Sequence, residues 1–223
     1  MPADIPTTSW IFPPVDDADE HGVVGIGADL EPGTLLAAYA SGLFPMPFGP
    51  SGPIAWWSPD PRGILEPAAF RPSRSLRRSM RRYDVTIDAA FDRVIDACRS
   101  LPRPGGWINT AMRDAYVHLH SLGWAHSIET WREGELVGGL YGVAIGGLFA
   151  GESMFHLATD ASKVALATLV EQVDDGRPRL IDTQWRTDHL ATLGVIDIPR
   201  REYRDRLSAV LATALPVCFA SRP

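Results

Sequence analysis

The chain has 223 residues, of which 45% are hydrophobic and 22% charged, so it is long enough to bury a core in one large domain or two small ones. No apolar run approaches the roughly 18 residues that span a bilayer, and the first residues, MPADIPTTSWIFPP, lack a secretion signal, so we expect a cytoplasmic protein with no membrane partner. The net charge of −6 disfavours nonspecific binding of polyanions, and Cys98 and Cys218 form no CxxC pair that would support a zinc site or a disulfide framework.

The N-terminal part of the sequence predicts a small domain with few regular elements. Residues 1–30 are rich in Pro and Gly and contain the acidic run DDADE, a composition that favours loops. Pro32 suits the first turn of a helix, apolar residues then recur at helical spacing, and Gly42 ends the helix. The prolines of FPMPFGPSGP and WWSPDPRG exclude a continuous helix or a central strand. We place a boundary near Arg62, which predicts domains at 1–62 and 63–223.

Three helices are predicted in the first part of the larger domain. Ser73 is placed to cap a helix that runs to Tyr83, and Asp88 to cap the next one. A third helix fits 110–122, where apolar residues again recur at helical spacing. The second helix would bury Phe91, Val94, Ile95 and Cys98 on one face.

Strands dominate the rest of the predicted fold. HSIETW and ELVGGLYGVAI flank Glu133-Gly134 and predict a hairpin, and GGLFAGESMF is the next strand. A helix over 161–173, a short strand RLIDTQW and a closing helix over 200–214 complete the pattern. This order is typical of the α+β class, in which helices cover a mixed sheet.

A stripe of arginines follows one face of the first of these helices. No acidic residue lies between Glu66 and Asp84 to neutralise the stripe. Such a face binds the phosphates of a nucleic acid, or it is simply a solvated charged surface, and the sequence leaves both interpretations open. The stripe consists of Arg74, Arg77, Arg78, Arg81 and Arg82, spaced i, i+3, i+4, i+7 and i+8.

Two carboxylates and an amide are candidates for one polar cleft. Asp182 and Gln184 stand two residues apart in RLIDTQW, so we expect them to project from the same face of a strand. Glu152 lies near the end of the preceding strand and would join them if the two strands are neighbours. The alternative is that these groups sit at a sheet edge and are satisfied by backbone donors.

Apolar side chains from the same region would line a pocket beside this cleft, or belong to an ordinary core. They are Leu166, Leu169 and Val173 on one helix face, with Leu140 and Phe149 from the strands.

Trp107 follows a Gly-Gly pair and would suit either a stacking platform for a base or a place in the core. Ser153, Asp182 and His189 follow the order of an α/β-hydrolase triad, but GESMF lacks the second Gly of a GxSxG elbow. No glycine-rich phosphate loop is present, so neither a nucleotide cofactor nor CoA is expected, and no residue spacing predicts a metal site.

Four segments of the sequence resemble the leucyl/phenylalanyl-tRNA-protein transferase family: WWSPDPRG (56–63), HSIETWREGELVGGLYGVAIGGLFAGESMF (126–155), ASKVAL (161–166) and LIDTQ (180–184). The resemblance spans about residues 22–205. It implies a bacterial enzyme that moves Leu or Phe, with Met as a further candidate, from aminoacyl-tRNA to proteins that begin with Arg or Lys. The product would be marked for N-degron proteolysis. The implied fold is an acyl-CoA N-acyltransferase-like domain after a small N-terminal domain, without cofactor or metal.

The resemblance also implies roles for individual residues. Asp182 and Gln184 match the catalytic Asp and Gln of the family, Glu152 matches its active-site Glu, and Trp107 matches the residue that stacks on the terminal adenosine of the tRNA. Some members carry a second stacking Trp in an FPWF segment, whereas this chain has FPMPF with Met46 at that point. Adenosine is therefore expected between Trp107 and Met46 or a neighbour. The implied aminoacyl pocket is Leu140, Phe149, Leu166, Leu169, Val173 and Ile181, and the implied contacts to the tRNA acceptor arm are Arg74, Arg77, Arg78 and Arg81.

Two other functions share parts of this pattern. A CoA-dependent N-acyltransferase would have the same fold but would bind acetyl-CoA. A noncatalytic RNA-binding module would use the arginine stripe alone and would bind charged and uncharged tRNA without forming a product.

Overall fold

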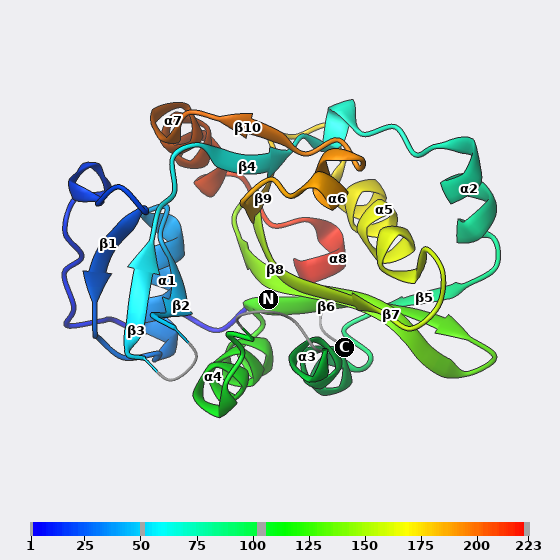
Figure 1. Ribbon diagram of the computed structural model, residues 1–223, viewed down its shortest axis with the longest axis horizontal. Helices are drawn as coiled ribbons and strands as arrows, with labels where there is room; N and C mark the ends of the chain where they lie inside the picture. Colours follow the sequence, from blue (N-terminus) through cyan, green and yellow to red (C-terminus); the bar gives the residue numbers. More distant parts are fainter. Residues whose placement is uncertain (1, 50–51, 102–105, 221–223) are drawn as a thin grey trace.

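Residues 2–49, 52–101 and 106–220 are described by the computed structural model, so Gly105 of the Gly-Gly pair lies outside the described residues. Within them the chain forms a small sheet and a large one (Figure 1). The small sheet has the order β1-β3-β2 and is made of β1 (Val23–Ile26), β2 (Phe44–Pro47) and β3 (Ile54–Trp57).

The small sheet is the main feature that the sequence did not predict. Its strands are short and contain prolines and glycines themselves: Pro45 and Pro47 lie within β2, an edge strand, and Gly25 lies within β1. The helix was predicted correctly: α1 (Pro32–Ala40) starts at a proline and is followed by Gly42, whose φ of +85° suits a residue without a side chain. Since α1 contacts β2 as well as helices of the larger domain, it joins the two parts of the molecule.

The large sheet has seven strands within the described residues. All neighbours are antiparallel except β8 and β9, which run parallel. In sheet order the strands are β10 (Ile196–Ile198), β4 (Arg62–Leu65), β9 (Leu180–Gln184), β8 (Leu148–His156), β7 (Glu135–Ile145), β6 (Ala125–Arg132) and β5 (Asp84–Ile87).

Helices cover both faces of the large sheet, and this confirms the predicted class of a helix-covered mixed sheet after a small N-terminal domain (Figure 1). One face is covered by α3 (Phe91–Ser100) and α4 (Thr110–Ser121), the other by α5 (Ala161–Val173) and α8 (Val217–Ala220). No helix of the described residues is long and apolar enough to cross a membrane. The remaining helical elements are η1 (Val15–Asp17), η2 (Pro67–Ala69), α2 (Arg74–Met80), α6 (Asp188–Ala191) and α7 (Arg200–Leu211).

The predicted start of α3 is wrong. Asp88 has a φ of +59° and does not cap the helix, whose N-cap position is Ala90. The Asp88 carboxylate instead accepts the Ser127 N–H at 2.9 Å and lies 2.7 Å from Nδ1 of His126. The buried Glu129 carboxylate accepts the N–H groups of Ala89 and Ala90, which directly precede α3, and the N-cap position of the helix has no side-chain hydrogen bond.

Other local predictions hold. Ser73 caps α2 by accepting the Leu76 N–H at 3.1 Å, although the helix ends at Met80 and not at Tyr83. The hairpin between β6 and β7 turns at Glu133-Gly134, and both residues have positive φ, as a tight two-residue turn requires.

Candidate active site

A cavity opens where the two parallel strands separate. β8 and β9 pair only as far as Ala150 and Asp182, and both strands then continue. The residues beyond that point diverge and line a cavity of about 650 Å³. Ligands commonly bind at the carboxyl ends of parallel strands, where no neighbour fills the space. The condition under which Glu152 would join Asp182 and Gln184, namely that their strands are neighbours, is therefore met.

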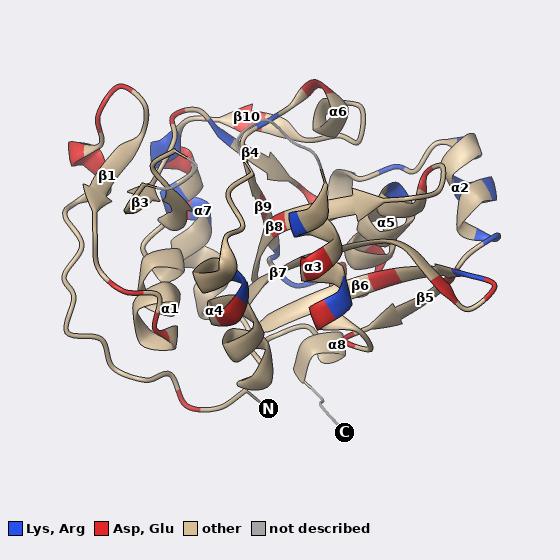
Figure 2. Ribbon diagram, turned by 60° about the horizontal axis from the view of Figure 1, so that its bottom comes forward, with Lys and Arg blue, Asp and Glu red and all other residues tan. Residues whose placement is uncertain are grey.

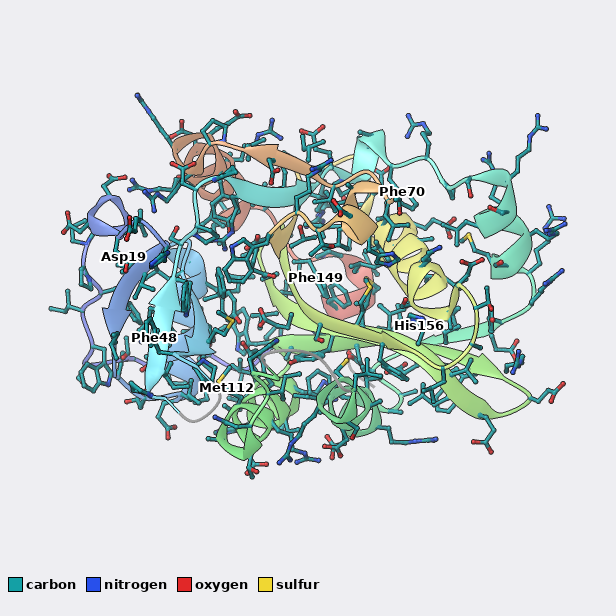
Figure 3. The ribbon with its side chains drawn as sticks, in the orientation of Figure 1. Asp19, Phe48, Phe70, Met112, Phe149 and His156 are labelled. Atoms are coloured by element: carbon teal, nitrogen blue, oxygen red, sulfur yellow. The ribbon has the colours of Figure 1, made fainter. Side chains whose placement is uncertain are left out.

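The floor of the cavity is apolar. It lies between the sheet and α5, and Figure 3 labels Phe149 on this floor, in the middle of the molecule. Val173 of the expected pocket packs in the same core cluster but does not line the cavity. The residues of the sequence-based set that do line it are Leu140, Phe149, Leu166, Leu169, Ile181, Met46, Trp107, Glu152 and Gln184.

Two tyrosines hold Glu152 at the edge of this floor. Oε1 of Glu152 accepts a hydrogen bond from the Tyr39 hydroxyl at 2.6 Å, and Oε2 accepts one from Tyr116 at 2.9 Å. The two hydroxyl oxygens are also 2.5 Å apart. The three contacts among Glu152 and the two hydroxyl groups thus have only two hydroxyl protons between them. All three are hydrogen bonds only when the carboxyl group is protonated and donates the third.

The Glu152 carboxyl therefore changes its protonation state near neutral pH. Burial raises the pKa of the Glu152 carboxyl to about 7, and the hydrogen bonds from Tyr39 and Tyr116 only partly oppose this increase. Such a group can take up and release a proton at cellular pH. Spacing along the sequence does not reveal these tyrosines as partners, because Tyr39 stands 113 residues and Tyr116 36 residues from Glu152.

Asp182 does not reach the cavity, in contrast to the sequence-based expectation. Its side chain is completely buried and forms a two-pronged ion pair with Arg62, at 2.9 Å to Nε and 2.6 Å to Nη2. Oδ2 also accepts from the Tyr203 hydroxyl at 2.9 Å, and Oδ1 from the Gln184 N–H at 2.9 Å. All four acceptor positions of the carboxylate are taken. The hydrolase-type triad with His189 is therefore not formed.

The ion pair is embedded in aromatic rings. The Arg62 guanidinium lies 4.4 Å from the centroid of the Tyr203 ring and 4.9 Å from that of Phe44. Burial disfavours the cation, but Asp182 outweighs this and holds the pKa of Arg62 above its usual range. A charged pair at this depth fixes the position of β9 against β4 and α7.

The chain turns sharply after Asp182. Gln184 has a φ of +58°, and the Trp185 N–H donates to the Thr183 carbonyl at 2.6 Å. This turn explains why Asp182 and Gln184 do not share a face: Gln184 is directed into the cavity wall together with Thr183 and Trp185. Such backbone strain persists only where surrounding contacts hold it, and here the Asp182 carboxylate holds the Gln184 N–H.

Two polar atoms of the turn have no hydrogen-bond partner within the described part of the chain. They are Oγ1 of Thr183 and Nε2 of Gln184, and both residues line the cavity. Gln184 is only 7% exposed, so its amide lacks a full hydration shell as well. Buried polar groups without partners are rare in native proteins, and a bound ligand is one explanation for them.

Gly63 makes room for this turn. It pairs with Gln184 across β4 and β9. A Cβ atom at position 63 would stand 2.6 Å from the carbonyl carbon of Trp185 and 2.7 Å from the amide nitrogen of Arg186. Arg62 and Gly63, at the end of WWSPDPRG, thus serve the site by supporting β9.

The arginine stripe runs along α2 and the turn that follows it, and none of its residues lines the cavity. In Figure 2 the ribbon of α2 carries blue segments, which mark basic residues, and no red ones. All five arginines are exposed, and none forms an ion pair with another described residue: Arg74, Arg77, Arg78, Arg81 and Arg82.

Comparison with known proteins gives matches over most of the chain. A solved structure described as L-PGS from Bacillus licheniformis overlaps 72% of this chain and 63% of its own, with a TM-score of 0.41 and 12% identity. Two relatives named leucyl/phenylalanyl-tRNA--protein transferase are far more similar. The one from Myxococcus xanthus is 50% identical over 90% of this chain and 88% of its own length. The one from Syntrophotalea carbinolica is 52% identical over 86% of each.

Family models agree with these relatives. The model described as leucyl/phenylalanyl-tRNA protein transferase matches residues 64–208, and the model of its N-terminal domain matches residues 28–60. The chain therefore belongs to the leucyl/phenylalanyl-tRNA protein transferase family and is an aminoacyltransferase.

Proposed function

We propose that this protein transfers Leu or Phe, with Met as a further candidate, from aminoacyl-tRNA to the N-terminal Arg or Lys of a protein. The modified protein would be marked for N-degron proteolysis, and the supply of charged tRNA makes the cytoplasm the site of the reaction. One observation carries the proposal: a single cavity combines an apolar floor with Glu152 and the unpartnered amide of Gln184. An aminoacyl ester needs such a combination, because its side chain is apolar and its carbonyl is polar.

The chemistry requires alignment more than activation. The acceptor amine forms a C–N bond to the ester carbonyl carbon, the C–O bond to the ribose breaks, and the amine proton is finally transferred to the ribose oxygen. An aminoacyl ester is already activated, so holding the two reactants in position supplies much of the rate. The free α-amine has a pKa near ~8, so a useful fraction is neutral at cellular pH.

Gln184 and Glu152 are assigned to the reacting groups. The Nε2 atom of Gln184 would donate to the carbonyl oxygen as negative charge develops there, which requires a donor that is not already engaged. Glu152, with its pKa of about 7, would attract the incoming ammonium and take up its proton. Asp182 would act through the turn by fixing the Gln184 N–H, since its own oxygens are occupied.

A transfer assay tests this proposal. The protein is incubated with radiolabelled Leu-tRNA, Phe-tRNA or Met-tRNA and a model protein that begins with Arg, and label is followed into protein. We expect label from Leu or Phe, and none when the model protein begins with Ala. Transfer from acetyl-CoA, or binding of tRNA without product, would instead identify one of the two alternative functions.

Charge reversal on α2 should weaken the binding of tRNA. Arg77→Glu combined with Arg81→Glu is expected to raise the Kd for tRNA and to lower the slope of log Kd against log salt, because each phosphate contact contributes a slope of about 0.9. Filter binding at several salt concentrations measures both. The matched control is Arg201→Glu with Arg204→Glu on α7, at the other end of the molecule (Figure 1). Equal changes in Kd and in salt slope for the two double variants would mean that the stripe has no specific role in binding tRNA.

Gly63→Ala should damage the site, although Gly63 itself does not line the cavity. The new methyl group would push against the backbone of Trp185 and Arg186 and displace the turn. We expect a loss of about 1–3 kcal/mol in the free energy of unfolding and a loss of transfer of about 100-fold. Urea unfolding and the transfer assay measure these effects. Gly25→Ala is the control, since a Cβ there would lie 3.8 Å from its nearest neighbour, and it should leave both quantities unchanged.

A further inference from the structure

We propose that Trp185 supplies a stacking surface for the terminal adenine of the tRNA, beside Met46 and together with Trp107. This inference rests on the proposed function. Trp185, Met46 and Trp107 all line the same cavity, and Trp185 keeps 39% of its surface exposed. An aromatic ring that is exposed beside a cavity offers a face on which a base can stack.

The turn at Gln184 places Trp185 where an adenine could reach it. Trp185 follows directly after this turn, and its N–H bond to Thr183 sets the direction in which the chain leaves the strand. Trp185 therefore lines the cavity with 39% of its surface exposed, directly after Gln184, which lines it too. A base on Trp185 would leave its aminoacyl group within the same cavity.

Neighbouring aromatic residues hold the ring beside Met46. Phe44 and Met46 alternate on β2 and so share one face, and the Phe44 ring lies 5.1 Å from Trp185 at 88°. Trp57 lies 6.2 Å from Trp185 at 68°, and its indole N–H donates to the Met46 carbonyl at 3.1 Å. Neither ring lies flat on Trp185, so a planar ligand can stack there.

Phe48 extends this aromatic cluster outward on the small sheet. It is 51% exposed and stacks on Trp57 at 6.1 Å and 15°, and Figure 3 labels it on that side of the molecule. The position that holds a second Trp in some family members is Met46 here. Trp185, which directly follows β9, lines the same cavity as Met46.

Charge favours a nucleotide over the acceptor protein on this surface. The next residue, Arg186, is a cation whose side chain is 42% exposed, and its contact with Asp197 spans 4.0 Å. A cation beside the ring attracts the phosphates that precede the adenosine and repels an N-terminal Arg or Lys. The competing outcome of the test is that the face of the Trp185 indole binds the N-terminal Arg or Lys of the acceptor protein.

The test compares Trp185→Ala and Trp185→Phe with the unaltered protein. The probe is a non-hydrolysable amide analogue of phenylalanyl-adenosine, with binding measured by calorimetry. We expect Trp185→Ala to raise its Kd about 5- to 150-fold, the range of base–aromatic stacking, and Trp185→Phe to keep most of the affinity. With an analogue that lacks the base, the Kd ratio between Trp185→Ala and the unaltered protein should fall to about one. Trp10→Ala is the control, because Trp10 is 47% exposed but lies in the N-terminal segment away from the cavity.

Steady-state kinetics separate the two substrates. Trp185→Ala should raise the KM for Phe-tRNA and leave the KM for the acceptor peptide unchanged. A rise in the acceptor KM alone, or an equal loss with the base-free analogue, would overturn the inference, as would an unchanged Kd. If the unaltered protein fails to bind the analogue at all, the proposed function itself is wrong. Equal melting temperatures of the variants establish that each is folded.

Discussion

Asp182→Asn is expected to abolish transfer and to destabilise the fold, although Asp182 lies outside the cavity. The substitution leaves Arg62 as a buried cation without a counter-charge, and breaking a buried ion pair in this way costs about 3–5 kcal/mol. It also removes a charged acceptor from the Gln184 N–H and so releases the turn. Urea unfolding measures the first effect and the transfer assay the second, with binding of tRNA to α2 expected to persist.

A double variant separates stability from positioning. Arg62→Met combined with Asp182→Leu replaces the pair with apolar groups, an exchange that is often neutral or stabilising. We expect it to recover much of the stability that Asp182→Asn loses. Transfer should stay lost, since Leu cannot accept the Gln184 N–H. Recovery of transfer together with stability would mean that Asp182 serves the fold alone, whereas full activity of Asp182→Asn would refute its assignment to the site.

The strands that carry the site could be predicted from the sequence, but the direction of their side chains could not. RLIDTQW has a strand pattern, and alternation put Asp182 and Gln184 on one face. The left-handed φ of Gln184 breaks that alternation at the last residue of the strand. No glycine or asparagine marks the turn, because its support comes from Gly63 and from Asp182 itself.

Partners that are distant in sequence were also beyond prediction. Tyr39 was expected only as one apolar position of a helix, yet it binds Glu152 across 113 residues. Arg62 and Tyr203, which hold Asp182, are 120 and 21 residues from it. Spacing patterns describe one element at a time, whereas these contacts depend on how α1, α4, α7 and β4 meet around the open end of β8 and β9.

The small sheet illustrates a different limit. Its strands are only four residues long and lie among prolines and glycines, so the local composition favours loops. Burial decides the structure there, because Trp56 and Phe44 enter the core at 1% and 3% exposure. Hydrophobic contacts with α1 outweigh weak strand propensity.

Glu152→Gln is expected to lower transfer by about 100-fold or more and to change its pH dependence. In the unaltered protein Glu152 is protonated below its pKa of about 7 and cannot accept a proton, so kcat/KM should rise as the pH increases through 7. A second rise near pH ~8 reflects the acceptor amine. The Gln variant should lose the first rise and keep the second. Rate measurements over roughly pH 5.5 to 9, a range that covers both rises, would resolve them.

Tyr39→Phe supplies a variant with a defined shift. Its hydroxyl stabilises the ionised form of Glu152, so its removal should raise the pKa of that carboxyl and move the first rise of kcat/KM to higher pH. Tyr83→Phe is the matched control, because the Tyr83 hydroxyl donates to the Thr159 carbonyl and does not line the cavity. A profile of Tyr39→Phe that coincides with the control would contradict the role of Glu152 as proton acceptor. A shift to higher pH would instead identify the proton acceptor as Glu152, the carboxylate that Tyr39 of α1 contacts.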